Sequence, residues 1–416
     1  MSEVQPVSGP SAPGGANRPK MAAARLVTLL HRHGPITRSQ ATEQLGLARS
    51  AVGTALEELA ALGVARLSEK AQTGSTRGRG RPSPVIEIHP DGPTVFAAYV
   101  RPDRIIHATV GLGQRMLDLS WDPLDAAAVV PETLARRLAD LAIGVMRRQR
   151  CVAVSVALSA TVREADGYVP SSLHLGWTDV PFAQLLRAHL PANLPVTIHR
   201  GSGLAALAEY RYGAGRGAAD LLALNCEHAG IGGGFVTGGD LFAGSGYAIE
   251  AGHITIEPNG RQCLCGARGC LEMYADGRAL LRAANVNADP RGDLTGQTAD
   301  VLANAAAGSP AAIQAIETTA RYLAAGLVGL VNTLSPERIV LNGLLAKVHH
   351  AASRLIIDEL SRSSIVARTG RVTICTGTLA HPTLLGAADK AFEPLLDDPW
   401  TALRPVSPAE QDHPRR

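Results

Sequence analysis

The sequence predicts an α+β winged helix-turn-helix domain followed by a larger α/β body made of two similar lobes. Three observations support this organisation. A chain of 416 residues is too long for one hydrophobic core. The first 88 residues contain three helical patterns and then two short strands around a segment rich in Gly and Arg. From residue 94 onward, apolar strands alternate with Ala-rich helices, and this order occurs twice.

Charge is distributed unevenly along the chain. Between residues 18 and 84, eleven Lys and Arg residues stand against four acidic residues, a net charge of +7, and the whole chain carries +3, so the remainder carries −4. A basic N-terminal part on a mildly acidic body predicts a polyanionic partner for that part alone. The sequence has neither an apolar stretch of about 18 residues nor an N-terminal signal pattern, so we expect a cytoplasmic protein without a membrane partner.

The N-terminal part has the element order of a helix-turn-helix. Apolar residues at helical spacing predict a first helix that stops at Gly34. Thr37 and Gln40 form a capping-box pattern at the start of a short second helix, which Gly46 closes. A third helix follows. In this arrangement the last helix enters the major groove of DNA.

The third helix is expected to present its first turns to DNA. Arg49 is placed to reach a guanine edge or a phosphate. Gly53 costs the helix about 1 kcal/mol relative to Ala but removes bulk where a DNA backbone approaches. A helical packing module with incidental charges is the alternative interpretation. The candidate DNA-contacting residues here are Arg38, Arg49, Ser50, Gly53 and Thr54.

A basic segment, Gly74–Pro82, lies between two expected strands at 64–67 and 85–88. A hairpin with such a tip is the wing of a winged helix. Its sequence Arg-Gly-Arg-Pro also resembles an AT-hook, a flat segment whose arginines fit a narrow minor groove. A solvated loop is the alternative. The candidate DNA-contacting residues of the wing are Arg77, Arg79 and Arg81.

The body is expected to contain two lobes that face one cleft. Strands are expected at 96–100, 105–110, 152–158, 195–199, 221–226, 234–237, 338–341 and 372–376, and helices at 134–147, 182–189, 203–210, 310–334, 348–361 and 384–392. The expected parts of the chain are a disordered tail (1–17), the winged helix-turn-helix domain (18–88), lobe 1 (89–205), lobe 2 (206–380), a helix that returns to lobe 1 (381–396) and a second tail (397–416).

Three of the six cysteines, Cys263, Cys265 and Cys270, lie within eight residues, and His253 precedes them by ten. In a reducing compartment such a cluster predicts a metal site rather than a disulfide. A set of three Cys and one His suits tetrahedral Zn²⁺. Because four protein ligands leave no open position, we expect a structural ion that does not activate water. A redox pair of Cys263 and Cys265 is the alternative.

Glu-x-Gly-His at 250–253, followed by Cys-x-Cys-Gly-x-x-Gly-Cys-x-Glu at 263–272, resembles the signature of the ROK family of repressors and sugar kinases. The N-terminal part ending in Gly-Arg-Gly-Arg-Pro looks like that of the family's transcriptional regulators. The resemblance implies an actin-like, ribonuclease H-like (ASKHA) body, a homodimer or homotetramer, and a sugar or sugar-phosphate effector in the cleft. It also implies that sugar hydroxyls are held by Glu250, His253 and Glu272.

Two departures from the family pattern argue against phosphoryl transfer. Family kinases carry Asn-Asp where this chain has His199 and Arg200, and an arginine cannot act as the base. The phosphate-cradling loops are also altered, and they read Tyr-Val-Arg-Pro-Asp at 99–103, Glu-His-Ala at 227–229 and Asn-Gly-Leu at 342–344. We therefore expect no catalytic residues. His199 and Arg200 remain candidate effector-binding residues.

Arg200 allows two interpretations. It clamps a phosphate or carboxylate of an anionic effector, or it forms an internal ion pair with Glu250 or Glu272 in a vestigial pocket. On either interpretation the sequence predicts a Zn²⁺-containing transcriptional regulator, a repressor of carbohydrate or related metabolic genes. Its dimer would bind an inverted-repeat operator in double-stranded DNA. The alternatives are a ligand-independent DNA-binding regulator and an ATP-dependent sugar kinase.

Overall fold

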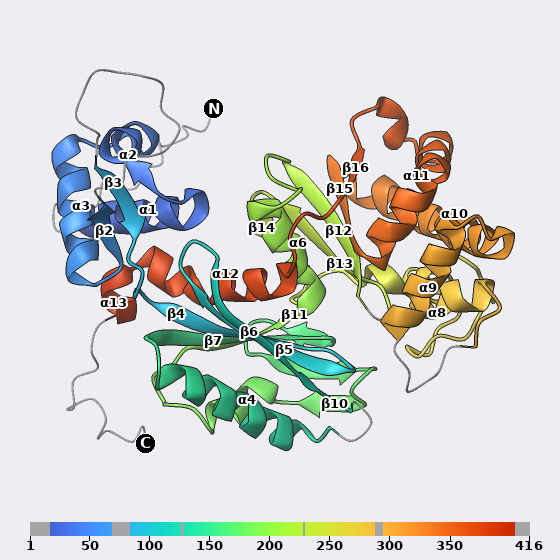
Figure 1. Cartoon of the computed structure of the whole chain (residues 1–416), viewed down its shortest axis with the longest axis horizontal. Helices are drawn as coiled ribbons and strands as arrows, with labels where there is room; N and C mark the ends of the chain where they lie inside the picture. The colour runs from blue at the N-terminus through green and yellow to red at the C-terminus, as the bar shows by residue number, and fades with distance from the viewer. Residues whose placement is uncertain (1–16, 69–83, 126–128, 228, 288–293, 404–416) are drawn as a thin grey trace, which may run out of the picture.

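The computed structural model describes residues 17–68, 84–125, 129–227, 229–287 and 294–403. Its N-terminal part consists of three helices and a three-stranded antiparallel sheet of order β1-β3-β2 (Figure 1). The capping box is confirmed, because the Thr37 side chain accepts from the Gln40 amide and Gly46 closes the helix with φ of 60°. The elements are α1 (Asn17–His33), β1 (Ile36–Thr37), α2 (Arg38–Leu45), α3 (Arg49–Ala61), β2 (Ala65–Ser68) and β3 (Val85–Ile88).

The body contains two five-stranded sheets with the same topology. In each sheet the first strand in the chain is central, an antiparallel hairpin lies on one side of it, and two parallel strands lie on the other. This repetition confirms that the body is a duplicated α/β unit. The lobe 1 strands are β4 (Thr94–Val100), β5 (Arg104–Gly111), β6 (Arg115–Pro123), β7 (Cys151–Leu158) and β11 (Val196–Arg200). The lobe 2 strands are β12 (Asp220–Cys226), β13 (Gly232–Thr237), β14 (Asp240–Leu241), β15 (Arg338–Gly343) and β16 (Thr373–Thr376).

Helices cover both sheets. The helices α4 (Pro131–Met146) and α5 (Phe182–Arg187) cover one face of the lobe 1 sheet. Lobe 1 also carries a small sheet of β8 (Thr161–Arg163), β9 (Tyr168–Ser172) and β10 (Trp177–Val180). The remaining elements of lobe 2 are η2 (Ala251–His253), α7 (Glu272–Ala275), α8 (Gly277–Ala283), α9 (Leu294–Ala306), α10 (Pro310–Leu334), α11 (Leu344–Ser363) and η3 (Ala367–Thr369).

Two helices meet between the lobes, α6 (Gly201–Tyr212) and α12 (Pro382–Asp397) (Figure 1). They approach backbone to backbone, because a Cβ on Gly386 of α12 would lie 2.1 Å from the Leu204 carbonyl oxygen of α6. The expected boundary between the lobes at 205 falls inside α6. A short helix, α13 (Pro399–Leu403), occupies part of the segment expected as a tail.

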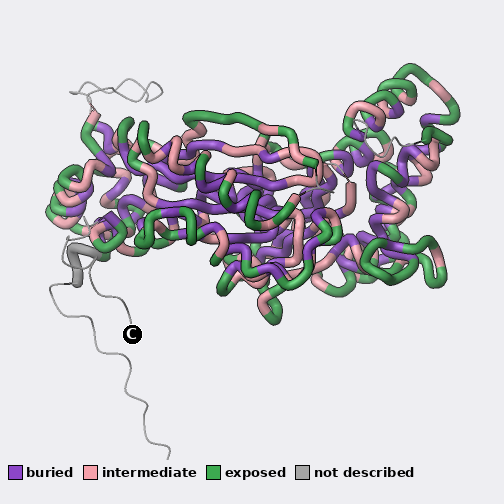
Figure 2. The backbone as a smooth tube through the Cα atoms, turned by 90° about the horizontal axis from the view of Figure 1, so that it is seen from below, coloured by how far each residue is buried: buried purple, intermediate pink, exposed green. Residues whose placement is uncertain are grey.

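The N-terminal part is joined to lobe 1 by a shared hydrophobic core. One cluster of buried side chains runs from Leu26 and Leu30 of α1 through Phe392 of α12 to Val95 and Ala97 of β4. Buried segments accordingly run through the middle of the molecule, and exposed segments lie at its rim (Figure 2). Within the described ranges, no helix combines the length and the apolar character needed to cross a bilayer.

Candidate functional site

The candidate site is a pocket between the two lobes. Lobe 1 contributes the end of β4, the segment after β7 and Arg200 at the end of β11. Lobe 2 contributes the turn before β13, the η2 region and the start of α7. The polar and charged residues that line it are Tyr99, Arg101, Ser159, Thr161, Ser171, His174, Arg200, Ser202, Asn225, Glu227, Glu250, His253 and Glu272.

At one edge of this pocket, His253 and the three clustered cysteines converge, and their ligand atoms all lie within 4.8 Å of one another. Cys265 Sγ is 3.6 Å from Cys270 Sγ, and Cys263 Sγ is 3.7 Å from His253 Nδ1. Metal–sulfur bonds of about 2.3 Å in a tetrahedron place sulfur atoms roughly 3.7 Å apart. The four residues therefore fit one tetrahedral ion, and the cluster could hold a metal.

Glycine is required in the loop that carries these ligands. Gly269 has φ of 78°, and a Cβ there would lie 1.8 Å from the Glu257 carbonyl oxygen. The Gly269 amide donates to the Arg261 carbonyl oxygen, and the Ile256 amide donates to the Gly269 carbonyl oxygen. These bonds hold Cys270 next to the strand-like segment after η2.

The metal-type cluster fixes two residues that face the pocket. His253 presents Nδ1 to the cluster, so its other ring nitrogen, Nε2, is left for the pocket. Glu272 is buried, and its Oε1 lies 3.1 Å from Cys263 Sγ and 3.7 Å from His253 Nδ1. A hydroxyl-bearing ligand would thus meet an imidazole and a carboxylate that the loop holds in fixed positions.

Arg200 lies at the end of β11, and its side chain is engaged within the protein. The Arg200 side chain is buried, and its Nη2 donates to Glu250 Oε2 over 2.7 Å. Its Nη1 donates to the carbonyl oxygen of Ile249. Burial lowers the pKa of Arg200, but a guanidinium remains protonated at neutral pH and cannot accept a proton. Of the two interpretations of Arg200, the ion pair with Glu250 is present.

A second arginine, which the sequence did not indicate as a site residue, forms a similar bridge. Arg101 of lobe 1 lies 3.5 Å from Glu227 of lobe 2 and also pairs with Asp103. Thr161 of lobe 1 donates to Glu250 Oε1 over 3.2 Å. Two ion pairs, Arg101–Glu227 and Arg200–Glu250, therefore connect the lobes at the pocket.

His199 does not line the pocket with Arg200. Its buried ring lies 3.4 Å from Glu164 Oε1. Neighbouring residues of a strand point to opposite faces, so residues 199 and 200 of β11 cannot both face the cleft. His174, which lines the pocket instead, comes from the loop between β9 and β10, and burial lowers its pKa. Its sequence context carries no signal for this position.

The candidate DNA-contacting residues of α2 and α3 lie at the surface of the N-terminal part. Arg38, Arg49, Ser50 and Thr54 are exposed, and Gly53 has open space where a Cβ would be. The buried face of α3, which packs into the core, is formed by Val52, Ala55, Leu56 and Leu59. The wing residues Arg77, Arg79 and Arg81 lie outside the described residues.

Comparison with known proteins identifies both regulators and kinases. The chain is 28% identical over 381 residues to the DNA-binding transcriptional dual regulator NagC of Escherichia coli K12, which covers 88% of this chain and 90% of that protein. It is 30% identical over 284 residues to a glucokinase of Streptomyces coelicolor, which covers 64% of this chain and 87% of that protein. The regulator thus matches a larger part of the chain than the kinase.

The fold is also similar to the crystal structure of a ROK family transcriptional regulator described as a homologue of the E. coli MLC protein. The two chains superpose with a TM-score of 0.72 at 21% identity, covering 91% of this chain and 97% of the other. The model of the ROK family matches residues 122–388, which include the part of lobe 1 from α4 onward, lobe 2 and the Cys/His loop. The chain belongs to the ROK family.

Proposed function

We propose that this protein is a cytoplasmic, DNA-binding transcriptional regulator, a repressor of carbohydrate or related metabolic genes, with a zinc-stabilised but non-catalytic sugar-kinase-type body. The observation that carries the proposal is the Arg200–Glu250 ion pair. If the resemblance to the family's kinases holds at this position, a permanent cation would stand where phosphoryl transfer needs a base, and the pair engages Glu250, a carboxylate that would otherwise hold a sugar hydroxyl. The proposed activity of the protein, DNA binding, then belongs to the basic N-terminal part and not to the cleft.

The order of three helices and a three-stranded sheet in the N-terminal part supports DNA recognition by a winged helix-turn-helix. Helix α3 would enter the major groove with Arg49 and Ser50 leading, and the wing would reach the flanking minor groove. A homodimer or homotetramer would present two such domains to an inverted repeat. Similarity to NagC, a DNA-binding regulator, supports this assignment.

The first prediction concerns DNA affinity. The purified chain is expected to bind its own upstream region with an affinity that falls steeply with salt, because phosphate contacts release counterions. The Arg79→Ala/Arg81→Ala double variant should weaken binding to DNA and reduce the salt slope by about 2. The separate Arg49→Ala variant should weaken binding mainly at specific sites. Fluorescence anisotropy over a salt series measures both quantities.

Arg354→Ala is the matched control for these variants. Arg354 is an arginine of lobe 2 whose side chain is 95% exposed, so its removal deletes one positive charge far from the N-terminal part. It should leave the salt slope unchanged. If the wing variants bind as tightly as the wild type, the proposed wing is wrong. Turnover of ATP with a hexose by the wild-type chain would establish the kinase alternative, which the glucokinase similarity motivates.

The second prediction concerns the pocket. Glu272 and His253 are held in fixed positions at the pocket, where they would hydrogen-bond to hydroxyl groups, so a sugar or sugar phosphate is the expected effector class. A thermal-shift screen of sugars, sugar phosphates and small acids should give a hit that Glu272→Gln abolishes. A chain that responds to no compound in a broad panel would instead be a ligand-independent regulator whose body serves for assembly.

A further inference from the structure

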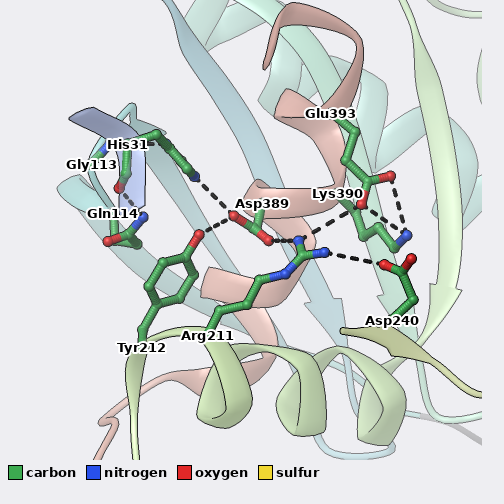
Figure 3. Close-up of polar contacts among 9 residues, drawn as sticks. All are labelled: His31, Gly113, Gln114, Arg211, Tyr212, Asp240, Asp389, Lys390 and Glu393. Atoms are coloured by element: carbon green, nitrogen blue, oxygen red, sulfur yellow. Dashed lines mark hydrogen bonds and ion pairs between the residues drawn. The ribbon is translucent and has the colours of Figure 1, made fainter. Parts of the chain in front are cut away.

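A buried polar cluster joins the N-terminal part to both lobes of the body (Figure 3). At its centre is Asp389 of α12, whose carboxylate meets His31 of α1 and both Arg211 and Tyr212 at the end of α6. His31 Nε2 lies 2.8 Å from Asp389 Oδ1, and both side chains are at most 2% exposed. We call these four residues the joint cluster.

The hydrogen bonds around His31 fix its protonation pattern. The amide of Gly113, in the turn between β5 and β6, donates to His31 Nδ1 over 3.0 Å. Nδ1 is therefore an acceptor, and Nε2 carries the hydrogen that is donated to Asp389. Gln114 Nε2 donates to the His31 carbonyl oxygen over 2.7 Å. The last turn of α1 is thus held from two sides, by lobe 1 and by α12.

The joint cluster also reaches lobe 2. Arg211 lies 3.5 Å from Asp240 of β14 and 3.7 Å from Glu393 of α12, in addition to its contact with Asp389 (Figure 3). Burial by itself raises the pKa of Asp389, but the His31 hydrogen bond and the charge of Arg211 outweigh this effect and hold the pKa well below its usual range. Asp389 therefore remains a carboxylate that accepts from three side chains of two helices, α1 and α6.

Helix α6 connects this cluster to the pocket. Its first residue follows Arg200, which pairs with Glu250 at the pocket, and its last two residues are Arg211 and Tyr212. A helix of 12 residues is about 18 Å long, so α6 spans the distance between the two sites as one rigid element. In its first turn, at Leu204, α6 packs on Gly386 of α12 without an intervening side chain, so the two helices have little freedom to separate there.

We propose that Asp389 is a positioning residue that couples the pocket to the DNA-binding domain, with α6 carrying the displacement. A change at the Arg200–Glu250 pair shifts α6 along α12, and the Arg211 and Tyr212 ends of α6 then pull on the carboxylate that holds His31. The orientation of α1, and with it α3, changes in consequence. This inference rests on the proposed function, and it specifies how the pocket regulates DNA binding.

A double-mutant cycle tests the coupling without knowledge of the effector. Glu250→Gln removes the charge that pairs with Arg200 at the pocket end of α6. Tyr212→Phe removes one hydrogen bond to Asp389 at the other end and keeps the ring. Glu250→Gln is expected to change the dissociation constant for the chain's own upstream DNA by about fivefold or more in the wild-type background. In the Tyr212→Phe background the same change should be less than about twofold.

Tyr210→Phe is the matched control, because Tyr210 lies on the same helix and its hydroxyl makes no side-chain hydrogen bond within the described residues. The effect of Glu250→Gln should persist in this background. An equal fold-change in the Tyr212→Phe and Tyr210→Phe backgrounds would overturn the inference. So would an unchanged dissociation constant for Glu250→Gln alone.

A second measurement does not depend on DNA. Hydrogen exchange of the peptide that contains Gly113 reports the bond to His31, and it should accelerate in Glu250→Gln relative to the wild type. Unchanged exchange at Gly113 would contradict the coupling. If no variant binds DNA, the proposed function fails, and the exchange result alone then decides whether the pocket and the joint cluster communicate.

Discussion

Replacement of Cys270 by serine is expected to abolish metal binding and to unfold lobe 2 at a markedly lower temperature. Cys270 is fully buried and is one of the four residues that could hold one ion, so its loss would leave only three of the four ligands that a tetrahedral site needs. Loss of a structural metal belongs to the changes that cost about 4 kcal/mol or more. Elemental analysis of the purified chain should fall from about one zinc per chain to a small fraction, and calorimetry should show the change in stability.

Cys375→Ala provides the control for this prediction. Cys375 lies in β16, away from the cluster, so its replacement should leave the metal content unchanged and the midpoint of unfolding within a few degrees. Treatment of the wild type with a chelator should reproduce the Cys270→Ser result. A wild-type chain that contains no metal and unfolds at the same temperature as Cys270→Ser would refute the structural role.

Asp389→Ala is expected to destabilise the protein by about 3 to 5 kcal/mol, because it leaves the charge of Arg211 and the polar groups of His31 and Tyr212 without their common partner in a buried setting. The pKa of Asp389 is depressed in the folded state, so its contribution is complete above the unfolded value of about 4 and is lost as the pH falls below it. The difference between variant and wild type should therefore be constant from pH 8 to 5 and should shrink in acid. Urea unfolding over a pH series measures it.

Glu393→Gln is the comparison for this variant. Glu393 also faces Arg211, but its side chain is 38% exposed, so its replacement should cost less than about 1 kcal/mol. Similar losses for Asp389→Ala and Glu393→Gln would mean that Asp389 has no special role in the joint cluster.

The sequence predicted those features that depend on local spacing. The metal-type cluster could be identified because three of its ligands lie in one short loop and the fourth precedes them by ten residues. The cap formed by Thr37 and Gln40 is local for the same reason. The duplicated topology followed from the repeated order of strands and helices, since hairpins and crossovers leave few alternatives.

Several elements were not predicted, for identifiable reasons. The strand β6 alternates Leu117, Leu119 and Trp121 with polar residues, but these apolar side chains are exposed, so the strand lacks the buried run that marked the others. Helix α11 begins at Leu344, four residues before the expected start, because Gly343 with φ of 62° turns the chain directly into it.

Contacts between distant segments could not be read from the sequence. Arg101 and Glu227 were each recognised as departures from a phosphate loop, but their pairing across the lobes depends on how the two sheets face each other. The opposite orientation of His199 and Arg200 could have been predicted, because side chains alternate between the two faces of a strand such as β11. The prediction that both residues bind the effector did not take this alternation into account.

The contact between His31 and Asp389 joins residues 358 positions apart. During synthesis, α1, α2 and α3 leave the ribosome long before α12, so the N-terminal part is made while the helix that completes its hydrophobic core is still missing. A nascent or truncated chain would therefore lack the contact between α1 and α12. If the N-terminal part binds DNA as proposed, its final orientation on the body would be one of the last steps of biosynthesis.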